Sequence, residues 1–301
     1  MTLLHVDRLV KTFPRGGGVF ARGRERFRAV DEVSFTLDRG RRLGVVGESG
    51  SGKTTLGRTV LGLFEPDEGT VKLGGVDLHR APRPEREAAR RRMQMIFQDN
   101  ASALDPRLRI GAAVAEPLRV AGLGANEAER GRRVLEWLER VGLDATLARR
   151  FSHELSGGQR QRVGIARALV VEPDLLIADE PVASLDVSIQ TQILKLLLEL
   201  VEQTGVALLF ISHDLRVVRA LTEHVLVMYR GRPVEYGPTT EVIARPLHAY
   251  TQSLVAAIPA LHPDRRRILA GPPPVEHDPT WLPEPAAWRE IEPGRHVLTP
   301  R

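Results

Sequence analysis

The chain has 301 residues, of which 42% are hydrophobic and 27% charged, and its formal net charge at pH 7 is +5. This composition is typical of a globular protein and excludes disorder over most of the chain, which is long enough for one large domain or two modest ones. The absence of cysteine excludes disulfides, thiolate metal sites and cysteine-ligated iron–sulfur clusters.

The sequence shows no targeting or membrane-spanning segment. Its start lacks the basic segment, apolar core and small-residue cleavage site of a secretory signal. No uninterrupted apolar run approaches the roughly 20 residues that cross a bilayer. We therefore expect the polypeptide to stay in the cytoplasm. Arginines cluster at residues 90–92 and 265–267; such clusters are typical of solvated faces, and an anionic lipid surface or nucleic acid is the alternative partner.

The first 80 residues predict strands around a glycine-rich loop. Apolar residues alternate near the N-terminus and again at 33–37, which predicts two half-buried strands joined by a loose loop. The apolar run 43–46 predicts a buried strand, and a helical pattern follows the glycines as far as Leu63. Residues 70–78 predict a strand pair. This order of elements is the start of an α/β core.

The glycine-rich loop fits the phosphate-binding pattern GxxxxGK[ST]. Glycines allow backbone N–H groups to turn toward phosphates, and the helix that follows adds its positive end. We expect Lys53 to reach the outer phosphates and Thr54 to hold magnesium. The alternative is a glycine-rich turn without a ligand. The loop predicts that a nucleoside triphosphate is bound by Gly47, Glu48, Ser49, Gly50, Ser51, Gly52, Lys53, Thr54 and Thr55.

The rest of the chain predicts a mainly helical insert at 100–155 and then a return to the core. In the insert, apolar residues share one helical face over 127–141 and Gly142 marks the end of that helix. Strands and helices then alternate, which predicts a largely parallel sheet. The predicted elements are a helix at 159–170, a buried strand at 175–178, an amphipathic helix ending near Gly205, a buried strand at 207–211 and a hairpin at 225–236.

Polar residues follow three of the predicted strands. Asp179 and Glu180 lie at the carboxyl end of a buried strand, which is where open α/β sheets bind ligands. In a triphosphatase, the first acid would contact magnesium and the second would polarise the attacking water. Strands also end in charged residues simply to leave the core. His213 and Gln98 follow apolar strands in the same way, and each alone is more often a cap or a surface residue.

A serine and two glycines open the predicted helix that begins near residue 156. Ser156, Gly157, Gly158 and Gln159 would leave backbone N–H groups and a positive dipole end pointing at an anion. A single helix start of this kind is usually no more than a cap.

With this motif the sequence resembles the ATP-binding subunits of ABC transporters, whose signature is LSGGQ. The resemblance implies an ABC-type P-loop ATPase fold, α/β, with a largely parallel core sheet, a small antiparallel β subdomain and a helical insert. It also implies ATP and Mg²⁺ as cofactors. The elements occur in the family's order: the phosphate loop at 47–54, Gln98, the signature at 155–159, Asp179 and Glu180, the D-loop at 184–186 with Asp186, and the switch histidine His213.

The resemblance assigns roles to these residues. It implies that Asp179 is the magnesium partner together with Thr54 and Gln98, and that Glu180 is the general base. It implies that His213 senses the γ-phosphate. It further implies that Phe13 stacks on adenine, where the family more often has tyrosine.

The sequence is similar to one branch of the family, the oligopeptide and dipeptide importers with their nickel and glutathione relatives. The similarity lies in residues 97–107, 179–190 and 246–251. Three residues depart from the branch pattern: Arg41 stands where glutamate is usual, Asp105 where asparagine is, and Ala249 where proline is. The predicted organisation is an ABC ATPase domain at 1–237 with its insert at about 100–158, a helical extension at 238–270, and a Pro-rich tail at 271–301 that is extended or disordered.

The resemblance also implies partners. One chain supplies one phosphate loop and one signature, so a second ATPase subunit is required, as a heterodimer or a homodimer. Two membrane permeases and, indirectly, an extracytoplasmic solute-binding protein complete the assembly. The chain itself is expected at the cytoplasmic face of the membrane. The expected function is ATP hydrolysis that powers import, with peptides as the expected substrate. The alternative is a soluble ABC ATPase acting on nucleic acid or ribosomes, although no nucleic acid is expected.

Overall fold

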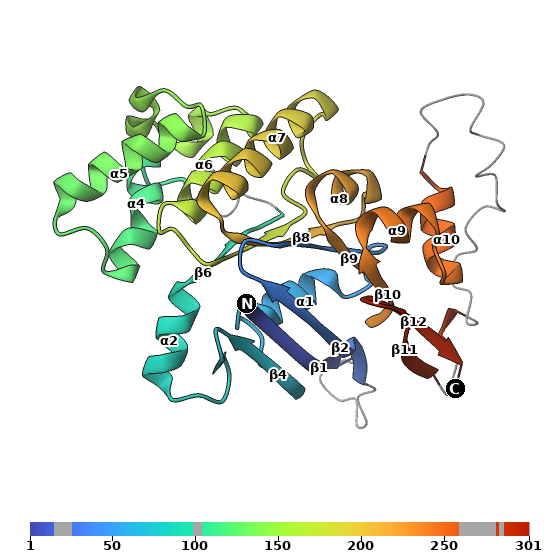
Figure 1. The fold of residues 1–301 in the computed structure, drawn as a ribbon. Helices are drawn as coiled ribbons and strands as arrows, with labels where there is room; N and C mark the ends of the chain where they lie inside the picture. Colours follow the sequence, from blue (N-terminus) through green and yellow to red (C-terminus); the bar gives the residue numbers. More distant parts are fainter. Residues whose placement is uncertain (15–25, 99–103, 259–280, 283–285, 301) are drawn as a thin grey trace, which may run out of the picture. The chain divides into compact units, whose positions relative to one another are not determined.

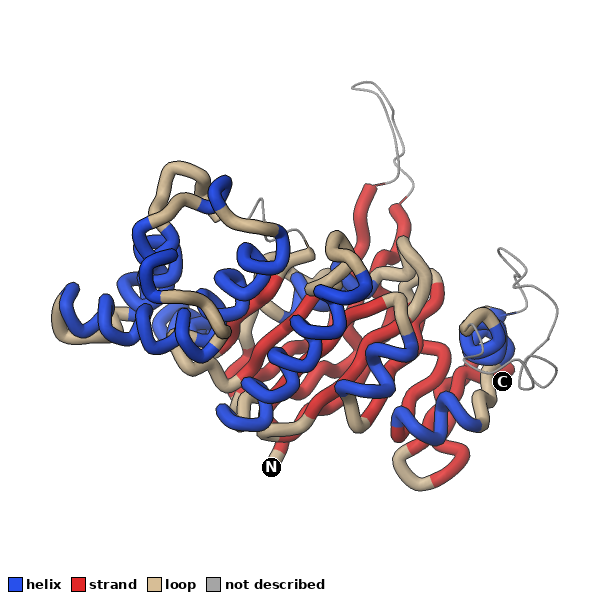
Figure 2. The backbone as a smooth tube through the Cα atoms, turned by 90° about the horizontal axis from the view of Figure 1, so that it is seen from above, coloured by secondary structure: helices blue, strands red, loops and turns tan. Residues whose placement is uncertain are grey.

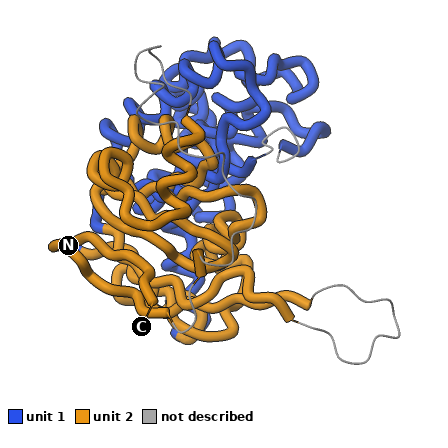
Figure 3. The backbone as a smooth tube through the Cα atoms, turned by 90° about the vertical axis from the view of Figure 1, so that its right-hand side faces the viewer, with its two compact units in different colours: residues 1, 38–40, 81–209 blue, residues 2–37, 41–80, 210–301 orange. Residues whose placement is uncertain are grey.

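The computed structural model describes residues 1–14, 26–98, 104–258, 281–282 and 286–300 (Figure 1). The chain forms two compact units (Figure 3). The first, here the signature unit, contains residues 1, 38–40 and 81–209; the second, the phosphate-loop unit, contains residues 2–37, 41–80 and 210–301. The predicted domain boundary at 237 stays a prediction. Three sequence features lie outside the described residues: most of the loop at 15–28, residues 99–103, and the arginines at 265–267.

The main sheet of the phosphate-loop unit has the strand order β11-β12-β10-β9-β3-β8, of which β8 begins in the signature unit. β3 and β9 pair in parallel, and β9 pairs with β10 in the predicted antiparallel hairpin. β9 and most of β3 are buried, as expected of apolar strands covered on both faces. The strands are β3 (Arg42–Val46), β8 (Ala207–Ser212), β9 (His224–Tyr229), β10 (Arg232–Pro238), β11 (Ala286–Glu292) and β12 (Arg295–Pro300).

A second sheet in the same unit has the order β2-β1-β4-β5. β1 and β4 are antiparallel, and β4 turns into β5 where the sequence has two glycines. Both β1 and β2 have buried and exposed positions, and the burial of β2 alternates from Val33 to Asp38, which confirms the predicted half-buried strands. The strands of both sheets are red in Figure 2. The bounds are β1 (Thr2–Pro14), β2 (Arg26–Asp38), β4 (Glu68–Leu73) and β5 (Val76–Asp77).

Two helices of the phosphate-loop unit begin at side-chain caps. Asp214 caps α8 by accepting a hydrogen bond from the Arg216 N–H, and His248 caps α10 through its Nδ1. The helix after the phosphate loop begins at Lys53, with Gly52 in the left-handed region as its N-cap. The helices are α1 (Lys53–Val60), α8 (Leu215–Leu221), α9 (Thr239–Ala244) and α10 (Ala249–Ala256).

The signature unit combines the start of β8, β7 and β6 with most of the helices. β6 and β7 are parallel, as predicted for this part of the core. α4 and α5 form the predicted helical insert, and both pack on α6, the signature helix. The elements are α2 (Arg83–Arg91), β6 (Met93–Ile96), α4 (Ile110–Ala121), α5 (Glu127–Arg140), two 3₁₀ turns (Ala145–Arg149 and Ser152–Glu154), α6 (Gly157–Leu169), β7 (Leu175–Asp179) and α7 (Val187–Thr204).

The predicted fold class is therefore confirmed, with one correction and one omission. The sequence reading missed α2, whose arginine-rich sequence gives little apolar periodicity. It also predicted an extended or disordered tail at 271–301. Within that range, β11 and β12 instead form a hairpin that pairs with β10. The proline content misled the prediction, because the prolines of the described hairpin lie at its turn and its end.

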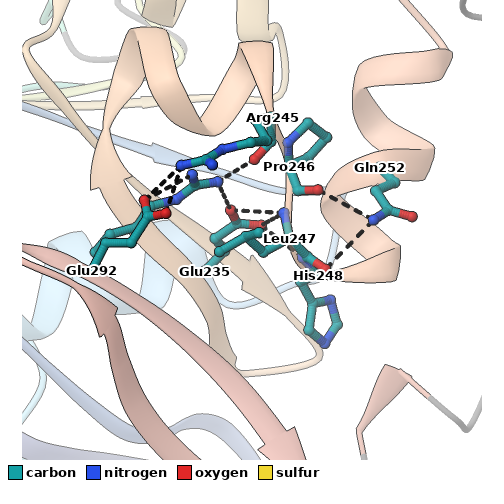
Figure 4. Close-up of polar contacts among 8 residues, drawn as sticks. Glu235, Arg245, Pro246, Leu247, His248, Gln252 and Glu292 are labelled. Atoms are coloured by element: carbon teal, nitrogen blue, oxygen red, sulfur yellow. Dashed lines mark hydrogen bonds and ion pairs between the residues drawn. The ribbon is translucent and has the colours of Figure 1, made fainter.

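A buried ion pair fixes this hairpin to β10. Glu235 of β10 and Arg295 of β12 are both fully buried, and the Arg295 Nη2 lies 2.9 Å from a Glu235 carboxylate oxygen. The same carboxylate accepts hydrogen bonds from the backbone N–H groups of Leu247 and His248 (Figure 4). Arg295 also donates to the carbonyl of Arg245. The buried Glu235 carboxylate is thus satisfied by partners distant in the sequence.

We expect Arg295→Ala to lower the free energy of unfolding by about 3–5 kcal/mol, because the Glu235 carboxylate would stay buried without its cation. Urea denaturation would measure the change. The matched control is Arg245→Ala, which removes the ion pair with Glu292 between two side chains that are 65% and 37% exposed. Exposed pairs of this kind contribute about 0–1 kcal/mol. Equal losses in the two variants would contradict the expectation.

Candidate functional site

The phosphate loop adopts a conformation that requires glycine. Gly47 has φ 154° and Gly52 has φ 97°. A Cβ at Gly47 would lie 2.2 Å from the Met228 carbonyl oxygen, and one at Gly52 would lie 2.0 Å from the Ala29 carbonyl oxygen. Neither position therefore tolerates a side chain. These two glycines let the backbone pass closely between β9 and β2 before it enters α1.

The loop is also held by hydrogen bonds from the turn between β9 and β10. The Gly231 N–H donates to the Ser51 carbonyl over 3.0 Å, and the Asp31 N–H donates to the Gly231 carbonyl over 2.8 Å. Asp31 further pairs with Arg232 at 3.2 Å. The loop is therefore fixed before any ligand binds, which reduces the entropy lost on binding.

Lys53 is buried, with a relative exposure of 5%. Its ammonium donates hydrogen bonds to the carbonyl oxygens of Gly47 at 2.7 Å and Glu48 at 2.8 Å. The loop thus places a cation beside its own carbonyls, at the first turn of α1. The positive end of the helix and the ammonium together favour an anion at this point.

Phe13, the predicted adenine-stacking residue, lies in β1 of the same unit. It is half-buried, and the centroid of its ring lies 6.1 Å from the ring centroid of Phe27 and 5.5 Å from that of Phe64. The Lys11 ammonium lies 5.7 Å from its ring centroid. Its partial exposure leaves aromatic surface for stacking.

His213 follows the end of β8 and is exposed. The next residue begins the cap of α8, and the Ser212 hydroxyl accepts a hydrogen bond from the Asp214 N–H at 3.0 Å. The main sheet of the phosphate-loop unit has β8 next to β3, the strand that leads into the phosphate loop. His213 therefore lies after a strand adjacent to the one that carries the loop.

In the signature unit, the two predicted acids lie at the carboxyl end of β7. Asp179 is fully buried at the last position of the strand. Glu180 follows with φ 44°, a left-handed conformation that is uncommon for a residue with a side chain. Gln98, just after β6, donates from its Nε2 to a Glu180 carboxylate oxygen at 3.2 Å. The structure therefore brings Gln98 and Glu180 together, and the strained backbone turns Glu180 out of the strand direction.

The signature residues form a complete capping box at the start of α6. The Ser156 hydroxyl accepts from the Gln159 N–H at 3.3 Å, and the Gln159 side chain accepts from the Ser156 N–H at 2.9 Å. Gly157 and Gly158 lie close to neighbouring side chains, which would have to shift to admit a Cβ. A Cβ at Gly157 would lie 3.3 Å from Leu185, and one at Gly158 would lie 2.9 Å from Ile189. The glycines thus let the helix start pack closely against the beginning of α7.

Asp186 caps α7, accepting a hydrogen bond from the Ile189 N–H at 3.0 Å. The Ser188 hydroxyl also donates to it at 2.7 Å, and this bond is the main cause of the lowered pKa of Asp186. The carboxylate therefore stays ionised at neutral pH, next to the signature helix start.

No sequence motif indicates a functional role for Tyr250. Its hydroxyl accepts a hydrogen bond from the Glu48 N–H, at the second position of the phosphate loop, over 2.8 Å. The residue lies in α10, more than 200 positions away in the sequence. Residues 246–251 were noticed only as a resemblance, and no local pattern connects them with the loop.

His248 caps α10 by accepting a hydrogen bond from the Tyr250 N–H at 3.2 Å. Burial lowers its pKa below the ordinary value of 6.5. The unfolded chain therefore binds a proton that the folded chain excludes, so the stability from this group is complete above about pH 6.5 and is lost as pH falls toward the folded pKa.

We expect the urea midpoint of the protein to fall between about pH 7.5 and pH 5.5, and to fall less in His248→Asn. The asparagine oxygen can keep the cap without titrating. Midpoints with the same pH dependence in both proteins would contradict this expectation.

The donors available for a metal are oxygens. The Thr54 hydroxyl, the Asp179 carboxylate and the Gln98 amide oxygen are the ligand types that Mg²⁺ prefers. Within the described ranges, no group of three or more His, Asp or Glu side chains is arranged to hold a metal.

A phosphate loop followed by a helix, acids at the end of a parallel strand and a glycine signature at a second helix start define an ATP-binding cassette ATPase. The sequence matches the ABC transporter family over residues 30–183 and the C-terminal region of oligopeptide/dipeptide transporters over residues 234–280. The chain belongs to the ABC transporter family, in its oligopeptide and dipeptide branch.

Named relatives support this assignment. The chain is 49% identical over 275 residues to a putative peptide import ATP-binding protein of Brucella abortus (strain 2308), covering 91% of this chain and 82% of that protein. It is 48% identical over 253 residues to a second putative peptide import ATP-binding protein, from Brucella ovis, covering 83% of this chain and 80% of the relative.

Solved structures share the fold. The dimeric post-hydrolysis state of the ATP-binding cassette MJ0796, bound to ADP and Pi, is similar with a TM-score of 0.69 and 30% identity. The alignment covers 79% of this chain and 99% of that structure. The cbiO1 protein of Clostridium perfringens, part of the cbiONQ complex, has a TM-score of 0.68 and 29% identity, over 81% and 91% of the two chains. The predicted family and fold are confirmed.

Proposed function

We propose that this protein is the ATP-hydrolysing subunit that powers a membrane importer of peptides. The observation that carries the proposal is the combination of a complete set of cassette motifs with the oligopeptide/dipeptide C-terminal region in one chain. The relatives at 48–49% identity are themselves described as peptide import ATP-binding proteins. No helix in the described part of the chain is long and apolar enough to cross a membrane. Separate permease subunits would supply the pathway, with this subunit at their cytoplasmic face.

The proposed roles follow the chemistry of each group. Lys53 and the N–H groups of the phosphate loop bind the phosphates, and Phe13 stacks on the adenine. Asp179, Thr54 and Gln98 hold Mg²⁺, whose charge would offset that of the phosphates when it is bound.

Hydrolysis needs a base for the attacking water. Glu180 takes the proton of that water and His213 contacts the γ-phosphate. The hydrogen bond from Gln98 orients the Glu180 carboxylate, since the two groups lie 3.2 Å apart.

The signature residues Ser156, Gly157, Gly158 and Gln159, with Asp186, are proposed to bind the nucleotide held by a second cassette subunit. The exposed Ser156 and the positive dipole end of the capped helix suit an anion that approaches from outside the unit. A similar cassette, MJ0796, is described as a dimer. ATP would hold the two subunits together and hydrolysis would release them, so that differential binding drives the movement of the permeases.

Reconstitution tests the proposal. The chain would be produced with its partner ATPase and permeases in vesicles, and uptake of a labelled peptide library would be followed with ATP present inside or outside. We expect uptake only when ATP is on the side that carries the ATPase, together with ATP hydrolysis. ATP-dependent uptake of nickel or glutathione in place of peptides would refute the proposed substrate.

A further inference from the structure

Tyr250 connects the C-terminal extension to the phosphate loop by a direct hydrogen bond. Its hydroxyl oxygen accepts the Glu48 N–H at 2.8 Å, while the Gly47 carbonyl of the same peptide unit accepts the Lys53 ammonium at 2.7 Å. The Gly47–Glu48 peptide unit is therefore held on one side by α10 and on the other by the lysine. We propose that Tyr250 is a positioning residue for nucleotide binding, acting through the Glu48 backbone on the placement of Lys53.

The ring of Tyr250 is fixed by an aromatic cluster. The side chain is fully buried, and its ring centroid lies 4.4 Å from that of Tyr229 and 5.2 Å from that of Trp281. Tyr229 and Trp281 lie 5.3 Å apart in an edge-to-face arrangement. Aromatic contacts of this geometry restrict the ring to one position. The hydroxyl is thus presented at one point rather than moving among rotamers.

Burial also keeps the hydroxyl neutral. It raises the pKa of Tyr250 well above the ordinary value of 10.0. A neutral phenol both accepts and donates, so the oxygen remains an acceptor for the Glu48 N–H without adding a negative charge near bound phosphates. An acidic residue in the same place would oppose an anionic ligand.

The backbone that carries Tyr250 is held independently. The buried Glu235 carboxylate accepts hydrogen bonds from the N–H groups of Leu247 at 3.1 Å and His248 at 3.0 Å (Figure 4). The Arg295 guanidinium donates a further hydrogen bond to the same carboxylate at 2.9 Å. His248 then caps α10 at the Tyr250 N–H. The terminal hairpin therefore fixes the segment 247–250, and this segment fixes the loop. A continuous series of hydrogen bonds therefore connects the terminal hairpin with the phosphate loop.

The position of Glu48 explains why one hydrogen bond matters. Glu48 is exposed and follows Gly47, which has no side chain to restrict the rotation of the peptide unit between the two residues. Without the Tyr250 hydroxyl, the Gly47–Glu48 peptide unit loses the acceptor of its N–H and gains freedom to rotate. The Gly47 carbonyl of that unit would then no longer hold the Lys53 ammonium in one place, and the loop would be less preorganised for phosphate.

The test compares Tyr250→Phe with Tyr229→Phe in the full chain. Each variant removes one hydroxyl from the same aromatic cluster and keeps the ring. We expect Tyr250→Phe to weaken binding of a fluorescent ATP analogue about tenfold, the usual effect of losing a buried hydrogen-bond partner. The KM for ATP should rise similarly with a smaller change in kcat. Tyr229→Phe should stay within about twofold of the unchanged protein. Equal affinity in Tyr250→Phe and the unchanged protein would overturn the proposal.

A second measurement does not depend on activity, and its first part uses the unchanged protein alone. Hydrogen exchange at the Glu48 amide should be slow in the unchanged protein and should approach its intrinsic rate in Tyr250→Phe. Unprotected exchange at Glu48 in the unchanged protein would refute the hydrogen bond itself.

The inference rests on the proposed role of Lys53 in phosphate binding. Two variants distinguish a wrong positioning role of Tyr250 from a wrong phosphate-binding role of Lys53. If Lys53→Ala binds nucleotide normally, the proposed function of the loop is wrong. If Lys53→Ala fails to bind while Tyr250→Phe binds normally, only the positioning role of Tyr250 is wrong.

Discussion

Replacing Glu180 by glutamine is expected to lower the rate of ATP hydrolysis by about a thousandfold while ATP binding is retained, because only the group that accepts the proton of water is lost. The backbone conformation at φ 44° suits either residue equally. The glutamine side-chain oxygen can still accept the hydrogen bond that Gln98 donates at 3.2 Å. The geometry of the site is therefore preserved and the chemistry alone is changed. Phosphate release and nucleotide binding would be measured on the assembled transporter.

The matched control for this variant is Glu199→Gln in α7. Glu199 is about half exposed, and its carboxylate lies 3.8 Å from the Lys195 ammonium. Its replacement changes the net charge by the same amount at a distant surface, and turnover should be unchanged. Hydrolysis by Glu180→Gln at the rate of this control would remove Glu180 as the general base.

Replacing Lys53 by alanine is expected to weaken nucleotide binding by about a hundredfold, because a charge-assisted hydrogen bond to phosphate is lost. The ammonium is buried and donates to the carbonyls of Gly47 and Glu48. Its removal therefore also takes away a donor that orders the loop. A titration with a fluorescent ATP analogue would measure the change.

Two further variants define the requirement at this position. Lys195→Ala removes an exposed lysine from α7 and should bind nucleotide normally. Lys53→Arg keeps the charge, but the planar guanidinium does not fit between two loop carbonyls that accept a compact ammonium, so it should bind poorly. Normal binding by Lys53→Ala would contradict the assignment of the loop.

Much of the fold was predictable because the motifs are local. Glycines within residues 47–55 adopt the positive φ angles that the phosphate loop requires. The capping box of Ser156 and Gln159 is formed by residues three positions apart. The apolar runs of β7 and β8 predicted buried strands for the same reason. The family order of the motifs then fixed the fold class.

The tail was predicted incorrectly because its order depends on a distant partner. Nothing near Arg295 in the sequence indicates that its guanidinium is buried against Glu235, 60 positions earlier. The proline content of 271–301 argued for an extended chain, whereas pairing with β10 supplies the hydrogen bonds that make a strand.

The sequence by itself determined the class of protein, the phosphate loop, the signature helix and the acids, since each is encoded by residue types at fixed short spacings. Only the tertiary structure decided how these parts are held: the Gln98 contact with Glu180, the glycine contacts with α7, and the Tyr250 hydroxyl on the Glu48 N–H. Such contacts join residues far apart in the chain. They arise when strand pairing and burial bring those segments together, and sequence periodicity does not record them.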